Sequence, residues 1–179
     1  MAKIITIPNP LLREKSKEIQ VFDKKIQDLA DELRKTLIDH EKKIKGVGLS
    51  AVQIGVLKRI FIVYSQSSKQ FLTFINPQII WFSKRLTDSK KGRYEGCLSV
   101  PGKWAKATRS KEVKVRYQTE SGTPQVRKFS GLTATIIQHE YDHIEGILFI
   151  DRALEQKAKI YEIVKDEKGK ESLQEVKLT

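Results

Sequence analysis

Gln138-His139-Glu140-Tyr141-Asp142-His143 is the stretch of sequence from which the fold of this chain can be worked out. Ser130 before it is a suitable N-cap, and Gly146 after it suits the C′ position, so the sequence predicts a helix between the two. The apolar residues that recur at roughly helical spacing are Leu132, Ala134, Ile136, Ile137 and Ile144. The polar stretch is therefore expected on a helix with one apolar face.

Two histidines on this helix predict a metal site. His139 and His143 are one turn apart and face the same way, and two neutral imidazoles so placed chelate one divalent metal. Glu140 lies beside them, where it can reach a water on the metal without being a ligand. The chain has only three histidines, so chance placement of two in His-Glu-x-x-His is improbable, although a helix that merely carries two histidines is the alternative. A catalytic metal of this kind usually has a third protein ligand.

The single cysteine is the candidate for that third ligand. Cys97 lies within residues 94–102, which we expect to form a loop. A thiolate and two imidazoles make a recognised set of three protein ligands. A buried structural cysteine is the alternative, and the residues favour ligation.

A glycine-rich segment at residues 46–55 offers another part of the site. Its three glycines permit positive φ or a close approach of the backbone to a ligand. The spacing is not that of a dinucleotide-binding fingerprint, and no strand precedes it. The side-chain amide of Gln53 could donate to an oxyanion if this segment folds over the metal.

Length and composition point to a single globular domain. We expect residues 1–179 to form one catalytic domain, since this length suits one core. No apolar run is long enough to span a bilayer, and the N-terminal residues lack the apolar region of a secretory signal, so no membrane association is expected. A single cysteine excludes an internal disulfide and fits a reducing compartment. A cytoplasmic location is expected, with an organelle as the alternative.

The net charge of +12 favours association with polyanions, RNA included. The lysines are scattered, however, and no aromatic-rich basic patch is visible. Two interpretations therefore stay open, a ribosome or RNA contact and a lysine-rich solvated surface; DNA is not expected as a partner.

Periodicity predicts the remaining elements. Residues 23–43 have the apolar spacing of an amphipathic helix, and His40 near its end is expected to be solvated or paired with the helix dipole. Residues 4–7 are expected to form a strand-like arm, and residues 151–159 are mixed in character. Strands are expected at residues 59–64, 70–75, 78–82, 111–118 and 125–129, with a terminal hairpin at residues 160–179.

Taken together in order, three stretches resemble the motifs of the peptide deformylase family. Residues 46–53 resemble Gly-x-Gly-Leu-Ala-Ala-x-Gln, residues 95–99 match Glu-Gly-Cys-Leu-Ser, and residues 139–143 match His-Glu-x-Asp-His. The likeness extends over about residues 4–155 and includes the Asn76-Pro77 turn. It implies a hydrolase that removes the formyl group from the N-terminal formyl-methionine of newly made polypeptides, and a contact with the ribosome is compatible with it.

The resemblance also implies the fold and the metal. The fold is α+β, with mixed or antiparallel sheets packed around the central metal helix and an amphipathic helix near the N-terminus. Cys97, His139 and His143 would bind one divalent ion, with Fe(II) expected and Zn, Ni or Co as substitutes. Glu140 would act as general base and acid, while Gln53 and the N–H of Leu98 would hold the formyl oxygen.

Further positions carry over from the family as substrate-binding residues. They are Gly46, Val47, Gly48, Gly96, Thr135 and Ile136. The chemistry has a physical basis, because a metal lowers the pKa of a bound water to about 7. Glu140 takes the proton, the hydroxide attacks the formyl carbon, and Glu140 returns the proton to the departing amine.

The sequence departs from the family in three places. Ser50 stands where alanine is usual, and since a small residue replaces a small one, little effect is expected. Trp104 stands where many members have an arginine that contacts the substrate. The tail lacks the long basic helix that some bacterial members place on the ribosome.

Three further hypotheses come from the residues. Arg109 and Asp142 are expected to form an ion pair that fixes the helix against the Cys97 segment. A zinc endopeptidase with Glu155 or Glu162 as third ligand is a competing enzyme. A basic RNA- or ribosome-binding module with a structural metal is the competing non-enzyme.

Overall fold

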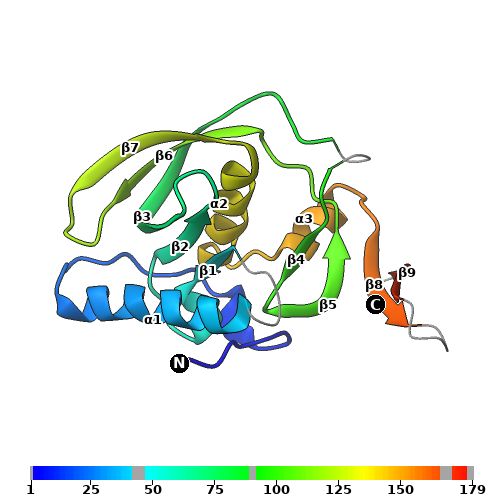
Figure 1. The fold of residues 1–179 in the computed structure, drawn as a ribbon, viewed down its shortest axis with the longest axis horizontal. Helices are drawn as coiled ribbons and strands as arrows, with labels where there is room; N and C mark the ends of the chain where they lie inside the picture. Colours follow the sequence, from blue (N-terminus) through cyan, green and yellow to red (C-terminus); the bar gives the residue numbers. More distant parts are fainter. Residues whose placement is uncertain (1, 42–46, 89–91, 166–170, 177–179) are drawn as a thin grey trace.

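The computed structural model describes residues 2–41, 47–88, 92–165 and 171–176. It has the α+β architecture predicted from the sequence, with helix α2 (Gly131–Ile144) lying centrally between two sheets (Figure 1). The other helices are α1 (Lys24–Glu41), α3 (Phe149–Glu155) and the 3-10 helices η1 (Pro10–Arg13) and η2 (Ala51–Ile54).

Both sheets are antiparallel. The larger has the order β1-β2-β3-β6-β7, and the smaller has the order β4-β5-β8-β9, so β1 and β4 are end strands. The larger sheet consists of β1 (Gly48–Ser50), β2 (Ile60–Ser65), β3 (Gln70–Phe82), β6 (Glu112–Gln118) and β7 (Pro124–Ser130). The smaller sheet consists of β4 (Glu95–Cys97), β5 (Val100–Ala105), β8 (Ile160–Lys165) and β9 (Glu171–Val176).

Strand β2 is buried on both faces, which explains its uninterrupted apolar sequence. Ile60 and Ile62 point to the side of α1, whereas Phe61 and Val63 point to the side of α2. The larger sheet therefore has one helix on each face, and α2 is held by the same strand that supports α1.

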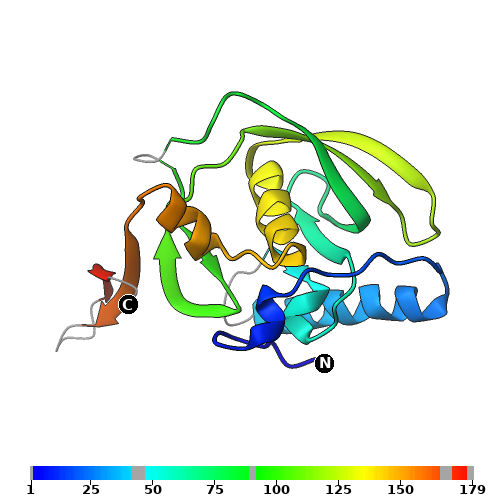
Figure 2. The ribbon, with the colours of Figure 1, turned by 180° about the vertical axis from the view of Figure 1, so that it is seen from behind.

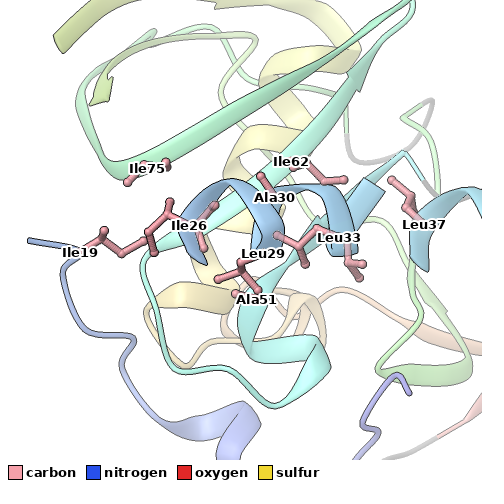
Figure 3. Close-up of a cluster of buried hydrophobic side chains, with 11 residues drawn as sticks. Ile19, Ile26, Leu29, Ala30, Leu33, Leu37, Ala51, Ile62 and Ile75 are labelled. Atoms are coloured by element: carbon pink, nitrogen blue, oxygen red, sulfur yellow. The ribbon is translucent and has the colours of Figure 1, made fainter. Parts of the chain in front are cut away.

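Helix α1 begins after Asp23, whose Oδ1 accepts hydrogen bonds from the N–H of Lys25 at 3.0 Å and of Ile26 at 3.3 Å. The predicted helix is present from Lys24 to Glu41, and residues 42 and 43 of the predicted range lie outside the described residues. Its apolar face packs on the larger sheet (Figure 3). The helical residues of this cluster are Ile26, Leu29, Ala30, Leu33 and Leu37.

Helix α2 begins and ends where its caps predict. Ser130 is the N-cap, and the helix ends at Ile144. Gly146 has a φ of +75°, and a Cβ on it would lie 2.5 Å from the carbonyl oxygen of Arg13. Only glycine fits there, so the N-terminal segment packs directly against the end of α2.

Strand β3 differs from the prediction. Asn76 and Pro77 do not separate two strands, because β3 continues through them with a register shift against β6. Asn76 takes a positive φ of 48°. Its side chain accepts from the Ile19 N–H at 2.8 Å and donates to the Ile19 carbonyl at 2.7 Å, which replaces the lost ladder bonds.

The arm at residues 4–7 belongs to neither sheet and is held by single backbone bonds. Helix α3 includes the first part of the segment at 151–159 that is mixed in character, and it packs against β5 of the smaller sheet, as seen from behind in Figure 2. One expectation is wrong: Cys97 is the last residue of β4 and not a loop residue, because residues 95–97 pair with β5.

The predicted terminal hairpin is present in the described residues, as β8 and β9. None of the helices in the described part of the chain is long and apolar enough to cross a membrane.

Candidate metal centre

The structure brings Cys97, His139 and His143 together from β4 and α2. Their ligand atoms all lie within 4.8 Å of one another, and Cys97 Sγ is 3.2 Å from His143 Nε2. A tetrahedral ion with bonds of about 2.0–2.3 Å holds its ligand atoms about 3.3–3.6 Å apart. The donor set therefore fits one transition-metal ion, and it is the one such group of three or more found among the described residues.

The N-terminal arm ties the two non-helical parts of the centre together. The N–H of Ile5 donates to the carbonyl of Gln53 at 2.8 Å, and the N–H of Ile7 donates to the carbonyl of Ser99 at 2.9 Å. Ser99 lies in the turn that joins β4 to β5, two residues after Cys97. The arm thus fixes the Cys97 turn relative to the Gln53 segment.

A buried carboxylate orients the first histidine. Glu95 Oε2 lies 3.0 Å from His139 Nδ1, which leaves Nε2 of His139 for a metal. Burial would raise the pKa of Glu95, but hydrogen bonds from His139 and Arg109 outweigh it and lower the pKa to about 2. The sequence indicated no role for Glu95 beyond its place in the motif. Its position two residues before Cys97 in that motif was the available signal.

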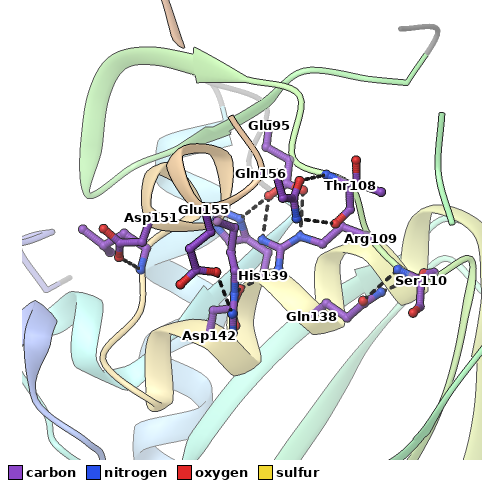
Figure 4. Close-up of polar contacts among 12 residues, drawn as sticks. Glu95, Thr108, Arg109, Ser110, Gln138, His139, Asp142, Asp151, Glu155 and Gln156 are labelled. Carbon is purple, nitrogen blue, oxygen red and sulfur yellow. Dashed lines mark hydrogen bonds and ion pairs between the residues drawn. The ribbon is translucent and has the colours of Figure 1, made fainter. Parts of the chain in front are cut away.

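The predicted ion pair between Arg109 and Asp142 is present and belongs to a larger network (Figure 4). Arg109 Nη1 lies 2.5 Å from Asp142 Oδ2, and the other side of its guanidinium faces Glu95. Arg152 Nη2 also reaches Asp142, at 2.8 Å. The network connects His139, through Glu95 and Arg109, to the next turn of the same helix.

The side-chain amide of Gln138 holds α2 against the connection between β5 and β6 that carries Arg109 (Figure 4). Its Nε2 donates to the carbonyl of Ser110 at 2.9 Å, and its Oε1 accepts from the N–H of Ser110 at 3.1 Å. Arg109 is therefore positioned through its own backbone as well as through its ion pairs.

The two histidines have opposite electrostatic settings. Burial, reinforced by the positive charges of His139 and Arg109, lowers the pKa of His143 well below its usual value. Burial also acts to lower the pKa of His139, but hydrogen bonds to Cys97 and Glu95 outweigh it and raise the pKa. The groups around His139 thus favour a positive charge on its ring. A proton and a metal ion would therefore compete for the same ring nitrogen.

Glu140 is buried beside the three ligands. Its carboxylate Oε2 accepts a hydrogen bond from Ser50 Oγ at 2.7 Å. Burial raises the pKa of Glu140. A Cβ on Gly48 would lie 2.6 Å from Glu140 Oε1 and 2.9 Å from Ile136, so only glycine lets β1 approach α2 this closely.

Gln53 also lies beside the centre. Its Nε2 is 3.5 Å from Cys97 Sγ and 3.2 Å from Ser99 Oγ. Leu98 directly follows Cys97 in the chain, so its backbone N–H is close to that ligand. A side-chain donor and a backbone donor are therefore available near Cys97.

A cleft of about 1340 Å³ opens over the centre and passes between β1 and β4. Gly96 lies under the ring of Trp104, where a Cβ would be 2.6 Å from the nearest ring atom. The substrate-binding residues expected from the sequence that line the cleft are Val47, Gly48, Gly96, Thr135 and Ile136. Gly46, also expected there, lies outside the described residues.

The alternative third ligands do not reach this centre. Glu155 is exposed and lies 3.2 Å from Arg152, and Glu162 forms an ion pair with Lys103. Neither belongs to the group formed by Cys97, His139 and His143, so the endopeptidase arrangement is wrong.

Comparisons with known proteins agree with this geometry. The family model for polypeptide deformylase matches residues 1–159. A peptide deformylase of Bartonella tribocorum is 38% identical over 156 residues, covering 84% of this chain and 83% of the relative. One from Desulforudis audaxviator is 40% identical over 151 residues, covering 84% and 92%.

Solved structures agree as well. The peptide deformylase of Thermotoga maritima superposes with a TM-score of 0.77 at 32% identity, covering 85% of this chain and 97% of that one. The Arabidopsis thaliana deformylase 1B in complex with an inhibitor gives a TM-score of 0.75 at 34% identity, covering 84% and 80%. The chain belongs to the polypeptide deformylase family, whose members are hydrolases that remove the formyl group from N-terminal formyl-methionine.

Proposed function

We propose that Cys97, His139 and His143 hold one divalent ion and that deformylation takes place in the cleft above it. The convergence of a sulfur and two imidazole nitrogens within 4.8 Å carries this proposal. Fe(II) is the ion we propose, with Zn, Ni or Co as substitutes, since thiolate and imidazole ligands suit all of these metals. When bound, the ion supplies Lewis acidity and lowers the pKa of a water molecule.

The formylated peptide would bind as an extended strand between the two sheets. β1 and β4 are the end strands that face the cleft, and each has a backbone edge to offer. Gly48 lets β1 lie close to Glu140, and Gly96 lets β4 lie against the Trp104 ring. Val47, Thr135 and Ile136 would border the methionine side chain, and the motif adds Gly46 to the substrate-binding residues.

Glu140 would move the proton. It takes one from the attacking water, and the water oxygen then forms a bond to the formyl carbon. When the carbon–nitrogen bond breaks, Glu140 gives the proton to the departing amine, so the products are formate and a free N-terminus. The raised pKa caused by burial suits a group that must both accept and release a proton.

Gln53 and Leu98 would stabilise the charge that develops on the formyl oxygen. The Gln53 side-chain amide lies beside Cys97, and Leu98, which follows Cys97 in the chain, also lines the cleft. Donors placed before the reaction starts need no rearrangement in the transition state, and loss of one typically costs about 10²–10³ in kcat.

The substrate implies a compartment that makes protein, and we propose the cytoplasm or an organelle with its own ribosomes.

A ribosome contact would use the outer face of the larger sheet. Lys114, Arg116 and Lys128 are exposed on β6 and β7 there, with Glu112 as the nearest acidic partner. Cosedimentation with ribosomes at increasing salt, for the wild type and a variant with all three changed to glutamate, tests this contact.

The activity itself is tested with formyl-Met-Ala-Ser and iron-loaded protein under anaerobic conditions. Release of formate is expected from the wild type. Glu140→Gln should retain the metal and lose turnover, whereas Cys97→Ala should lose both. Metal-loaded wild-type protein that releases no formate would contradict the proposal.

A further inference from the structure

Ser50 forms hydrogen bonds with two polar side chains beside the centre, those of Glu140 and Gln53. Its hydroxyl is 2.7 Å from Glu140 Oε2 and 3.0 Å from the Glu140 main-chain carbonyl oxygen. Its backbone N–H donates to Gln53 Oε1 at 2.8 Å. Ser50 is itself fully buried, at 0% exposure, so water does not compete for these bonds.

The backbone bond determines which end of the Gln53 amide faces the ligands. Because Oε1 accepts from Ser50, Nε2 is the end directed toward Cys97 and Ser99. Any residue at position 50 except proline could make this bond. The family's usual alanine would therefore keep Gln53 in place.

The side-chain bond is different, since alanine cannot make it. Among the described residues, Ser50 is the residue whose side chain donates a hydrogen bond to the Glu140 carboxylate. By fixing Oε2, the hydroxyl leaves Oε1 beside Gly48, on the side of the cleft. The expectation that serine is equivalent to alanine considered only its size.

We infer that the hydroxyl of Ser50 is a positioning group that holds the Glu140 carboxylate in the orientation required for proton transfer. This inference rests on the proposed role of Glu140. A hydroxyl both donates and accepts. It donates to the ionised carboxylate; when Glu140 carries the proton, Oγ can accept from it and donate its own hydrogen to the Glu140 carbonyl. Ser50 thus keeps a bond to Glu140 at each stage of the reaction.

The test compares three variants at position 50 with a control at position 16, each with its metal content measured. Ser50→Ala should lower kcat about tenfold with KM changed less than twofold, as expected for loss of a hydrogen bond to a charged group. Ser50→Thr and Ser50→Val have the same size, and only threonine keeps the hydroxyl. Ser16→Ala is the control, because Ser16 is a buried serine with no recorded partner for its Oγ.

Three results would support the inference together: the tenfold loss in Ser50→Ala, a higher kcat for Ser50→Thr than for Ser50→Val, and a displaced Glu140 side chain in a crystal structure of Ser50→Ala. The same structure should show Gln53 unmoved. Wild-type kcat in Ser50→Ala, or equal kcat in the threonine and valine variants, would overturn it. If Glu140→Gln also had full activity, the proposed role of Glu140 would fail instead.

Discussion

Arg109 and Glu95 are joined by two hydrogen bonds, from Nε to Oε1 at 2.9 Å and from Nη2 to Oε2 at 3.0 Å. This bidentate pair is buried, and Glu95 also contacts His139. A surface ion pair contributes little to stability, whereas a buried, hydrogen-bonded pair cannot lose one partner without leaving a charge unpaired. The geometry of a metal-site histidine therefore depends on an arginine that is not a ligand.

Replacing Arg109 with alanine should destabilise the protein and weaken its hold on metal. Glu95 and Asp142 would both lose their buried partner, which costs about 3–5 kcal/mol. Loss of a residue that orients a metal ligand typically lowers metal affinity about 10–100-fold. Urea unfolding of the metal-free protein and competition with a chelator measure the two effects separately. Arg127→Ala, at an exposed position on β7, is the control, and unchanged metal affinity in Arg109→Ala would contradict the prediction.

Replacing Cys97 with alanine should abolish stable metal binding, because two histidines alone do not complete the site. Glu155→Gln and Glu162→Gln should bind metal like the wild type, since their carboxylates pair with Arg152 and Lys103. Metal content after dialysis distinguishes these variants without any activity measurement. Retention of one equivalent by Cys97→Ala would mean that the third ligand has been misidentified.

A methyl group at position 48 should impair turnover more than folding. In Gly48→Ala the new Cβ meets Glu140 Oε1 and Ile136 at 2.6 and 2.9 Å, so the carboxylate or β1 must move. We expect kcat to fall by about 10²-fold, which is at the lower end of the rate that a general base typically contributes. Gly55→Ala is the matched control: its φ of +81° makes alanine unfavourable, but no atom lies within 4 Å of the added group. Gly55→Ala should lose stability and keep kcat. Full kcat in Gly48→Ala, or a lowered kcat in Gly55→Ala, would contradict the prediction.

Gly96 and Trp104 should be energetically coupled. Gly96→Ala places a Cβ 2.6 to 2.9 Å from three atoms of the Trp104 ring, so the indole must leave its position over the strand. KM for the formylated peptide is expected to rise several-fold. In the double variant with Trp104→Ala the clash is gone, so the added methyl should have a much smaller effect than in the wild-type background. Equal effects in both backgrounds would exclude the coupling.

The parts of the molecule that could be predicted from sequence are those that depend on neighbouring residues. Helix α2 could be located from its caps and apolar spacing, and the ligand set could be proposed because residue chemistry limits it to one thiol and two imidazoles. The Arg109–Asp142 pair was also predicted and is present. The helix follows from local spacing and the ligand set from the scarcity of thiols and imidazoles, whereas the ion pair joins residues 33 positions apart.

What could not be predicted depends on distant partners. Asn76-Pro77 looks like the end of a strand, but β3 passes through it, and the Asn76 side chain bonds to Ile19, 57 residues earlier in the chain. Glu95 has no recognisable role until His139 is brought within 3.0 Å of it. The bond from Ser50 to Glu140 spans 90 residues, and size alone therefore suggested that Ser50 had no effect.

The two backbone bonds of the N-terminal arm, from Ile5 to Gln53 and from Ile7 to Ser99, carry a consequence for assembly. The two acceptors lie some fifty and ninety residues later in the chain, so the arm can dock on them only after both have been made. Loosening the arm would therefore disturb two parts of the catalytic pocket at once.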